Sequence, residues 1–291
     1  MMSNLSKTMR AVAAAAVLTV VPVVAAHASG DAPHIERHHW TFGGLGGHFD
    51  RKQLQRGFQV FKDVCSSCHG LNRVAFRNLV EKGGPEFPEE GVKALAAAWP
   101  NQVIDGPNDK GKMFERPAKL SDRILGPYRN EKEARDNQNG ALPPDLSLIT
   151  RARNTHHEAP WYKHVFLMLG DVLIGYQEGG ADYVYALLTG YHEPPAGMQM
   201  ADGMNYNMAF PGHQIAMVQP IPEGGAVKYQ EGAGATASLP QNAADVTAFL
   251  AWAADPTLEQ RKRMGWIVML YLLVTTILLY FGKRRLWSKY H

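Results

Sequence analysis

Apolar residues recur with the period of an α-helix at two places in the chain. In residues 51–64, the side chains of Leu54, Phe58 and Phe61 occupy positions i, i+4 and i+7 and so share one helix face. After Asn242, which we expect to cap a helix N-terminus, the apolar positions that share a face are Val246, Phe249, Leu250 and Ala253. Both segments are therefore predicted to be amphipathic helices that pack on a core.

A third apolar segment lies near the C-terminus. Residues 266–281 contain no charge, and with the neighbouring uncharged positions they would form a helix of about 28 Å, close to the thickness of a bilayer core. Basic residues stand on both sides of this segment, and aromatic residues mark both its ends. We expect residues 256–291 to form one membrane helix and a short tail, with Pro256 in the first helical turn. A buried core helix is the alternative.

Much of the remaining chain has the composition of loops. Residues 83–148 are rich in proline, glycine and polar side chains, and predicted helical patches, such as 91–99, interrupt them. Residues 190–240 are similarly loop-like. Between these stretches, the apolar run 165–174 is too short to span a bilayer and predicts a surface helix or hairpin, followed by a short helix at 182–188.

Residues 1–28 have the composition of a secretory signal peptide. Lys7 and Arg10 form a basic start, residues 11–26 are apolar, and Ala26-His27-Ala28 offers small residues for cleavage. An uncleaved anchor is the alternative interpretation. A signal peptide places the following domain outside the membrane and the C-terminal tail in the cytoplasm.

Charge is unevenly distributed along the chain. The net charge is +3, but residues 29–260 hold 21 of the 30 basic and all 27 acidic residues, which gives this part a net charge of −6. An acidic body can attract a cationic partner, and it can equally serve ordinary solubility. The densest acidic cluster, Glu86, Glu89 and Glu90, is a candidate docking patch. No nucleic-acid partner is expected.

The clearest chemical signal is the segment Cys65-Ser66-Ser67-Cys68-His69. Two cysteines two residues apart, followed directly by histidine, are the attachment pattern of a c-type haem: the thiols bond the vinyl groups and the histidine ligates the iron. The alternatives are a thioredoxin-like redox pair, which needs a βαβ context, and half of a zinc site, which needs two more ligands nearby. Neither requirement is met by the surrounding sequence. The chain has only these two cysteines, so no disulfide is expected.

The function of such a haem depends on its sixth ligand. With one protein ligand the iron can bind a gas or perform catalysis, and with two it mainly transfers electrons. The downstream candidates are Met198, Met200, Met204, Met208, Met217 and His213. A methionine ligand raises the reduction potential, and a second histidine would give a lower one. Because methionine is also a flexible core filler, spacing alone does not choose among the six.

Further motifs are spread over nearly the whole chain after residue 28. They are QLQRGFQV (53–60), DGPN (105–108), RP (116–117), KLSD (119–122), NGALPPDLS (139–147), RAR (151–153), DYV (182–184), LLTGY (187–191), EPP (193–195), FPG (210–212), IAM (215–217) and RKRMG (261–265). Together these motifs resemble the cytochrome c1 family, the haem subunits of quinol–cytochrome c reductase complexes. The combination is specific, although each motif alone is weak.

The resemblance implies a fold and an activity. We expect an all-α, cytochrome c-like haem domain with long loops in residues 29–255 and a single C-terminal transmembrane helix. The implied activity is electron transfer, from the Rieske iron–sulfur protein through haem c to a soluble or membrane-tethered cytochrome c. The implied setting is a dimeric oxidoreductase complex with cytochrome b in a bacterial inner membrane, with the haem domain in the periplasm and lipid around the helix. No independent catalytic site is expected.

The resemblance also assigns residues to the haem site. The family's sixth ligand is the methionine that closes a Pro-Gly-x-x-Ile-x-Met segment, which is Met217 here, opposite His69. Arg153 and Tyr183 resemble the residues that meet the haem propionates, a role that suits the planar guanidinium of an arginine. Pro144 is stiff and lacks an amide donor, so it can line a haem edge, although a plain turn is its commoner use.

Two features depart from known relatives. Residues 155–180 have no counterpart in mitochondrial members and resemble a bacterial insertion. Some bacterial relatives carry a second cysteine pair near the distal ligand, and without it packing and hydrogen bonds must hold the Met217 loop. Two other functions remain as alternatives: a free-standing, membrane-tethered cytochrome shuttle, and a five-coordinate haem sensor that would bind carbon monoxide.

Overall fold

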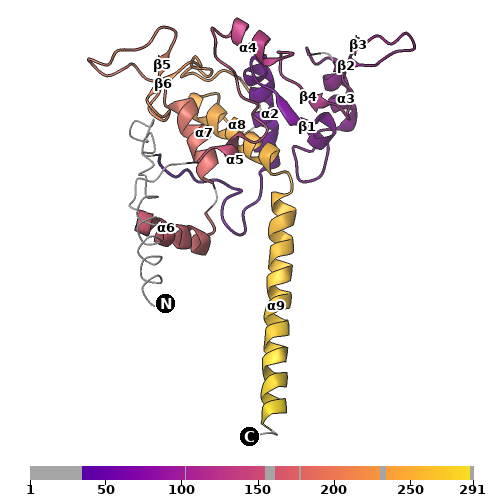
Figure 1. Ribbon diagram of the computed structural model, residues 1–291, viewed down its shortest axis with the longest axis vertical. Helices are drawn as coiled ribbons and strands as arrows, with labels where there is room; N and C mark the ends of the chain where they lie inside the picture. Colours follow the sequence, from indigo (N-terminus) through magenta and orange to yellow (C-terminus); the bar gives the residue numbers. More distant parts are fainter. Residues whose placement is uncertain (1–34, 102, 155–160, 177, 230–233, 289–291) are drawn as a thin grey trace, which may run out of the picture. The chain divides into compact units, whose positions relative to one another are not determined.

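The computed structural model describes residues 35–101, 103–154, 161–176, 178–229 and 234–288; the expected signal peptide lies outside these ranges. The helices are α2 (Arg51–Asp63), η1 (Cys65–Ser67), η2 (Phe76–Leu79), α3 (Glu89–Ala97), α4 (Glu131–Asn137), α5 (Ile149–Ala152), α6 (Trp161–Ile174), α7 (Gly179–Thr189), α8 (Leu239–Ala254) and α9 (Leu258–Trp287) (Figure 1). The fold is mostly helical and long loops connect the helices, so the predicted fold class is confirmed.

Three small antiparallel sheets add to the helices. They pair β1 (Leu71–Ala75) with β4 (Arg123–Ile124), β2 (Val103–Asp105) with β3 (Phe114–Arg116), and β5 (Asn205–Tyr206) with β6 (Gln214–Ile215). These strands of two to five residues were not predicted, because such short pairings leave almost no alternating pattern in the sequence. They brace the loops around the site described below.

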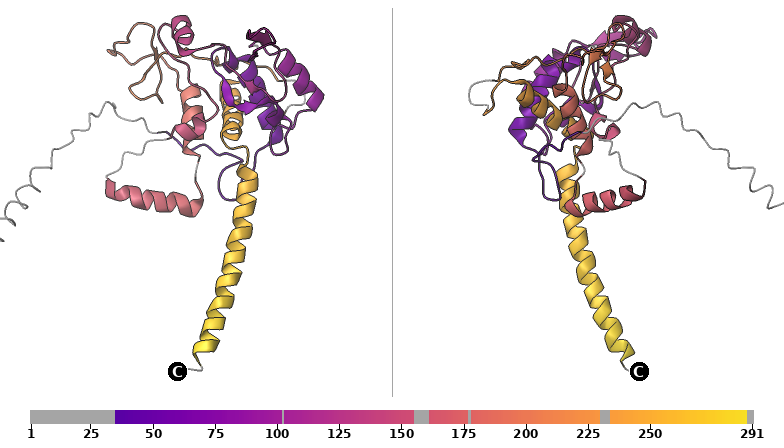
Figure 2. Two further views of the ribbon diagram at one scale, coloured as in Figure 1. Left: turned by 45° about the vertical axis from the view of Figure 1, so that its right-hand side comes forward. Right: turned by 90° about the vertical axis from the view of Figure 1, so that its left-hand side faces the viewer.

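The core forms where α2 crosses α8, and both Figure 1 and Figure 2 show these helices side by side. Asp50 caps α2 by accepting from the backbone amide of Lys52, at 2.9 Å. Gly57 permits the crossing, since a Cβ there would lie only 2.0 Å from the carbonyl oxygen of Asp245. Phe249 of α8 packs on Phe58, with the ring centroids 5.5 Å apart. The two predicted amphipathic helices therefore bury their apolar faces against each other.

A nearly buried ion pair fixes the register of this crossing. The Nε and Nη2 atoms of Arg56 donate to the two carboxylate oxygens of Asp245 at 2.8 and 2.9 Å. The carboxylate is fully buried and the guanidinium is 13% exposed. A bidentate pair of this kind holds both helices in one relative position, because each partner would be buried without the other's charge if they slid apart.

We expect Asp245→Ala to lower the free energy of unfolding by about 3–5 kcal/mol, since it removes this acceptor from a largely desolvated guanidinium. Thermal unfolding of the purified full chain in detergent measures the change. Lys93→Ala is the control, because Lys93 pairs with Glu89 and Glu90 at the surface, and little change is expected there. Equal midpoints for the two variants would contradict the structural role of the pair.

Helices α5 and α7 pack on each other and on α8. Gly180 makes the contact close, since a Cβ there would lie 1.9 Å from the carbonyl oxygen of Thr150. Asp182 of α7 is fully buried and accepts from the backbone amide of His38 at 3.0 Å, the Trp40 indole at 2.7 Å and the Tyr176 hydroxyl. The segment that precedes α2 is thereby tied to α7 across more than a hundred residues of sequence.

Four predicted helix starts need correction. The prediction that Asn242 caps α8 is wrong: α8 begins at Leu239, and Ser238 caps it by accepting from the amide of Gln241. Asn242 is buried within the helix, where its carbonyl oxygen accepts from the amides of Ala226 and Val227. The last helix begins at Leu258, two residues after Pro256, and α7 and α3 begin three and two residues before the predicted starts at 182 and 91. The other three shifts are of two or three residues, because a local pattern locates a helix end only to within a few residues.

Helix α9 is long and apolar enough to cross a membrane. It has 30 residues and a mean hydropathy of 2.1, and none of its apolar window is buried by the protein. Only Leu258 at its start is buried. A buried core helix, the alternative considered above, would be covered by the domain, so the span is the better interpretation. The apolar run at 165–174 forms the end of α6, which is a helix and not a hairpin.

Candidate functional site

The two cysteines lie in a tight turn at the end of α2. Helix α2 ends at Asp63, and η1 follows with Cys65 as its first residue. The carbonyl oxygen of Cys65 accepts from the amides of Cys68 at 3.1 Å and His69 at 2.9 Å, which curls the backbone around the motif. Both thiols are free and half-buried. The local spacing that predicts haem attachment is therefore realised as one compact turn at the edge of the core.

His69 is oriented by a backbone carbonyl far along the chain. Its Nδ1 donates to the carbonyl oxygen of Pro144 at 2.7 Å, which leaves Nε2 as the nitrogen available to ligate a metal. Burial lowers the pKa of His69, so the imidazole is held in the neutral form that binds iron. Pro144 thus contributes its carbonyl, a role that the stiffness of its ring alone did not predict.

The segment that contains Pro144 is itself fixed to the residues after the motif. The amide of Leu146 donates to the carbonyl of Gly70 at 3.0 Å, and the amide of Asn72 donates to the Asp145 carboxylate at 2.7 Å. Further along, the amide of Arg73 donates to the hydroxyl of buried Ser147 at 3.0 Å. Residues 144–147 are therefore held by hydrogen bonds beside His69 and the residues that follow it.

The alternatives for the cysteine pair do not fit this geometry. Burial raises the pKa of the Cys65 thiol to about 12, whereas a thioredoxin-like pair needs a thiol whose pKa is lowered. Within the described residues, no group of three or more His, Cys, Asp or Glu side chains could hold a metal ion, so a complete zinc site is not found there. Two free thiols beside an oriented imidazole are the donor set that covalent haem attachment requires.

A cavity of about 810 Å³ opens beside Cys68. It is lined by Cys68 and Gly70, by the loop around Tyr128, and by Leu142 and Pro143. Its volume is within the range of sites that bind small molecules and cofactors. The nitrogen of Gly126 lies only 2.5 Å from where a Gly70 Cβ would be, so the two backbones meet without room for a side chain at the edge of this cavity.

We expect Gly70→Ala to destabilise the domain by about 1–3 kcal/mol, because the added methyl group must push the 125–127 loop away. Gly91→Ala is the matched control, since no atom lies within 4 Å of its Cβ position and it is in α3. The thermal midpoint of each full-length variant measures the effect. Gly91→Ala should keep or raise the midpoint, because alanine favours a helix over glycine. The close approach is unimportant if Gly70→Ala does not lower the midpoint.

Arg153 and Tyr183, the residues predicted to meet the propionates, come from two neighbouring helices. Arg153 follows the last turn of α5 and is exposed, and Tyr183 is 8% exposed in α7, which packs on α5. Burial raises the pKa of Tyr183, and the positive charge of Arg153 acts in the opposite direction. These two packed helices therefore offer a hydroxyl from α7 and a cation from the residue that follows α5.

Met217 lies in a loop that is fixed to the end of α7. Its carbonyl oxygen accepts from the Tyr191 hydroxyl at 3.1 Å and from the Asn205 amide group at 3.4 Å. Asn207, fully buried, donates to the carbonyl of Leu187 at 2.8 Å and accepts from the amide of Ala209 at 2.9 Å. The expectation that hydrogen bonds hold the Met217 loop agrees with these contacts.

The other candidate ligands have different environments. Met204 is 41% exposed and Met208 is 52% exposed, so both are more exposed than Met217, which is half-buried. His213 is half-buried, and its Nδ1 donates to the carbonyl oxygen of Asn207 at 3.2 Å. Met198 and Met200 are half-buried, as is Met217. Burial therefore divides the five methionines into two exposed and three half-buried ones, a distinction that their spacing in the sequence did not give.

The structure brings the predicted residues together in two groups. Cys65, Cys68, His69 and Pro144 form one. The other lies along α7 and the residues beside it: Tyr183 is in α7, Arg153 follows α5, which packs on α7, and Met217 is bound through its carbonyl to Tyr191, two residues after α7. Sequence reasoning missed the roles of Tyr191 and Asn207. Tyr191 closes the LLTGY motif, so its position was visible, but the carbonyl to which it donates was not.

The chain is similar to known proteins over most of its length. Residues 40–290 match the model of the Cytochrome C1 family. The chain is 46% identical over 270 residues to the protein named Cytochrome c1 of Blastochloris viridis, which covers 93% of this chain and 92% of that protein. It is 46% identical over 253 residues to Cytochrome b/c1 of Bradyrhizobium diazoefficiens, covering 87% of this chain and 35% of the relative. It is 42% identical over 255 residues to the mitochondrial heme protein Cytochrome c1 of Schizosaccharomyces pombe, covering 88% of this chain and 73% of that protein.

Proposed function

Because this chain belongs to the cytochrome c1 family and is the electron-transfer subunit of a cytochrome bc1 complex, we propose that it holds one haem c, bound covalently through Cys65 and Cys68. The observation that carries this proposal is the contact of His69 Nδ1 with the Pro144 carbonyl, 2.7 Å long, directly after the two free thiols. When bound, the haem supplies one-electron chemistry. The protein supplies attachment, one oriented imidazole and a partly apolar cavity.

We assign the sixth ligand to Met217. Its side chain is half-buried and its backbone is fixed by two hydrogen bonds, whereas Met204 and Met208 are more exposed. A loop fixed in this way holds a thioether in place at little further loss of conformational entropy. We assign the haem propionates to exposed Arg153 and to Tyr183 of α7, which offer a charged fork and a hydroxyl.

Residues 1–28 are proposed to be the signal peptide, 29–255 the haem domain with an insertion at 155–180, and 256–291 the membrane anchor. The anchor proposal rests on α9, whose apolar window is uncovered by the described protein. The haem domain then lies in the periplasm and the C-terminus in the cytoplasm of a bacterium. Cytochrome b is the proposed partner within the membrane, supported by the Bradyrhizobium relative whose name combines cytochrome b with c1.

We further propose that the haem accepts an electron from the Rieske iron–sulfur protein and passes it to a soluble or membrane-tethered cytochrome c, within a dimeric complex. Detergent extraction tests this, since the chain should co-purify with a b-type cytochrome and an iron–sulfur protein. A reduced-minus-oxidised spectrum with a haem count should show one c-type haem per chain. Purification of the chain alone from native membranes would favour the free-standing shuttle, and carbon monoxide binding to the native reduced protein would favour the sensor.

The acidic cluster Glu86, Glu89 and Glu90 is a weaker docking candidate than the sequence suggested. Glu86 accepts from Arg51 at 3.1 Å, and Glu89 and Glu90 both pair with Lys93. Changing all three glutamates to glutamine should slow reduction of a cationic cytochrome c by up to about tenfold at low salt, and should make the rate less dependent on ionic strength. Stopped-flow kinetics at several salt concentrations measures both effects.

The matched control removes the same number of charges elsewhere, by amide substitutions at the exposed residues Glu36, Asp136 and Glu223. A general effect of net charge would slow both triple variants equally. If the cluster variant reacts as the parent protein does, the three glutamates are solvated charges without a docking role.

A further inference from the structure

Helix α6 carries an apolar surface that the described residues do not cover. Its exposed fractions include 73% for Phe166, 61% for Met168, 68% for Val172 and 80% for Leu173. Soluble domains rarely leave so many large apolar side chains of one helix in water. This surface includes none of the residues assigned to the haem site above, and it lies within the proposed insertion at 155–180. We therefore expect something other than the described residues to cover this surface.

The apolar residues of α6 share one side of the helix. With about 100° between successive residues, an arc of about 160° contains only apolar and aromatic side chains. The described members of this arc are Tyr162, Val165, Phe166, Met168, Leu169, Val172 and Leu173. The charged and titratable side chains of the helix, Lys163, His164 and Asp171, all lie on the opposite side. We call the first set the apolar arc.

One ion pair attaches to the protein the side of α6 that is opposite the apolar arc. Asp171 accepts from Arg37 at 2.7 Å, and the Arg37 guanidinium lies 3.8 Å from the centre of the Tyr176 ring. Arg37 belongs to the segment that Asp182 holds against α7. Since Asp171 lies on the side of α6 opposite Leu169, its attachment to Arg37 directs Leu169 and its neighbours outward.

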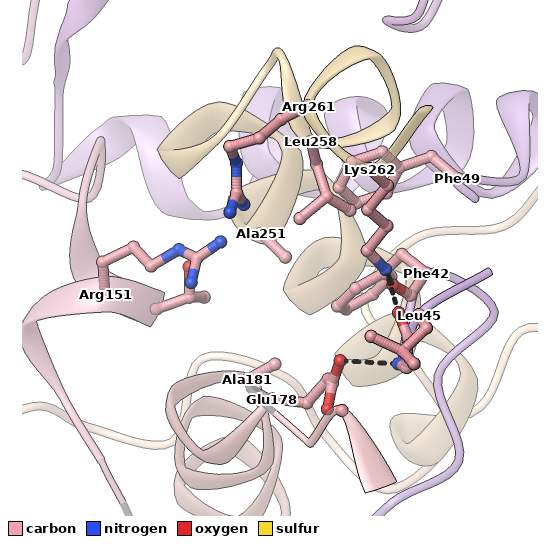
Figure 3. Close-up of a pocket in the computed structure, with 13 residues that line it drawn as sticks. Phe42, Leu45, Phe49, Arg151, Glu178, Ala181, Ala251, Leu258, Arg261 and Lys262 are labelled. Carbon is pink, nitrogen blue, oxygen red and sulfur yellow. Dashed lines mark hydrogen bonds between the residues drawn. The ribbon is translucent and has the colours of Figure 1, made fainter. Parts of the chain in front are cut away.

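The loop of residues 42–45 contacts the start of α9 on one side, and on the other the residues that lie between α6 and α7. The Gly44 amide donates to Glu178 at 3.0 Å, and the Gly44 carbonyl accepts from Lys262 Nζ. The same ammonium donates to the Phe42 carbonyl at 2.7 Å, and Leu45 packs against Gly175, the residue after α6. Figure 3 shows Glu178 and Lys262 reaching toward this loop from its two sides.

These contacts place the end of α6 at the membrane boundary. Lys262 lies in the second turn of α9, and Arg263 is the last charge before the uncharged run begins at Met264. Two residues of helix rise only about 3 Å. The bilayer that α9 crosses therefore begins close to the level of Gly44, whose loop contacts the residues that follow α6.

We propose that the apolar arc of α6 lies in the interfacial layer of the bilayer that α9 spans, so that α6 is a second, in-plane membrane contact. The occupant of the surface is lipid: the arc is wide and uncharged, and the contacts of the 42–45 loop bring it to the depth at which acyl chains begin. Lys163 and His164, on the other side of the helix, remain at the headgroup level. The inference depends on the membrane span of α9 and does not depend on the haem ligands.

Two leucines of the same helix provide a matched test. Leu169 in the apolar arc is 51% exposed and Leu167 on the opposite side is 43% exposed, so without a bilayer their surroundings are similar. Leu169→Cys and Leu167→Cys are each labelled with an environment-sensitive fluorophore in the full complex, in nanodiscs of phosphatidylcholine with spin-labelled acyl chains. The parent chain, which has the same two native cysteines as every variant, serves as the labelling blank, and Leu270→Cys in α9 reports a lipid-exposed site.

We expect the Leu169 label to be quenched by the spin-labelled lipid about threefold or more over the Leu167 label, and to be less accessible to aqueous iodide. Equal quenching at the two positions would overturn the proposal. Protection of the Leu169 label from both iodide and lipid would also overturn it, since a protein surface would then cover α6. Failure of the Leu270 label to be quenched would remove the membrane span and this inference together, while the haem assignment would stand.

Discussion

Simultaneous replacement of Cys65 and Cys68 by alanine is expected to abolish covalent haem attachment completely. These are the only cysteines of the chain, and both thiols are free in the turn that ends α2. Without a sulfur to bond the haem, His69 offers at most one coordinate bond, which does not survive denaturation. Denaturing gel electrophoresis with haem staining should therefore show a haem band for the parent chain and none for the double variant.

The matched control changes the two residues between the cysteines. Ser66 and Ser67 donate to nearby carbonyls at 2.7 and 2.8 Å, so Ser66→Ala with Ser67→Ala removes two local hydrogen bonds and no haem bond. It should retain the stained band, with a stability loss of about 1–2 kcal/mol. Each single cysteine variant should keep one thioether bond and shift the haem absorption band. Covalent haem in the double alanine variant would show that the attachment assignment is wrong.

Features set by neighbouring residues were predictable from the sequence. Helix α2 was expected at 51–64 and is found at Arg51–Asp63, because Asp50 caps it and its apolar period is complete within the segment. The haem motif, the C-terminal span and the exposed helix at 165–174 are likewise local patterns of spacing or composition. In each case the information lies within one or two helical turns or in one uninterrupted run.

Features set by tertiary contacts were not predictable in this way. No spacing rule indicates that His69 donates to the Pro144 carbonyl, 75 positions away, or that Asp182 is the buried acceptor for Trp40, 142 positions away. The misplaced start of α8 has the same origin, because Asn242 has a capping residue's chemistry but uses it on the backbone of a distant loop. Such partners depend on which loops the fold brings together, and the sequence supplies only the residue types.

The buried polar residues share a physical role that a search for catalytic groups overlooks. Asp182, Asn207 and Asn242 are fully buried, and each satisfies two or more backbone or side-chain donors. Long loops carry many peptide groups that regular structure does not pair, and each buried one needs a partner. These side chains therefore replace the missing secondary structure and hold the loops of the site in place.

Met217 lies in one of these fixed loops, and its replacement is expected to change the haem and leave the backbone in place. Met217→Leu should lower the reduction potential of the haem by on the order of 0.1 V or more, since axial ligands tune potentials over about 0.8 V and a thioether raises them. The variant should also bind carbon monoxide in its reduced form, because leucine leaves one axial position without a ligand. Redox titration and carbon monoxide difference spectra of the purified complex measure both effects.

Met204→Leu is the control, because this substitution also replaces a methionine by leucine in the same loop region. The Met204 side chain is 41% exposed, so it is not expected to ligate the iron. It should retain the parental potential and resist carbon monoxide. A parental potential in Met217→Leu would instead assign the ligand to Met198, Met200 or His213, the remaining half-buried candidates. The loop itself should persist in either variant, since Tyr191 and Asn205 bind the Met217 carbonyl, which leucine also provides. A change in potential can therefore be attributed to the lost sulfur and not to a displaced backbone.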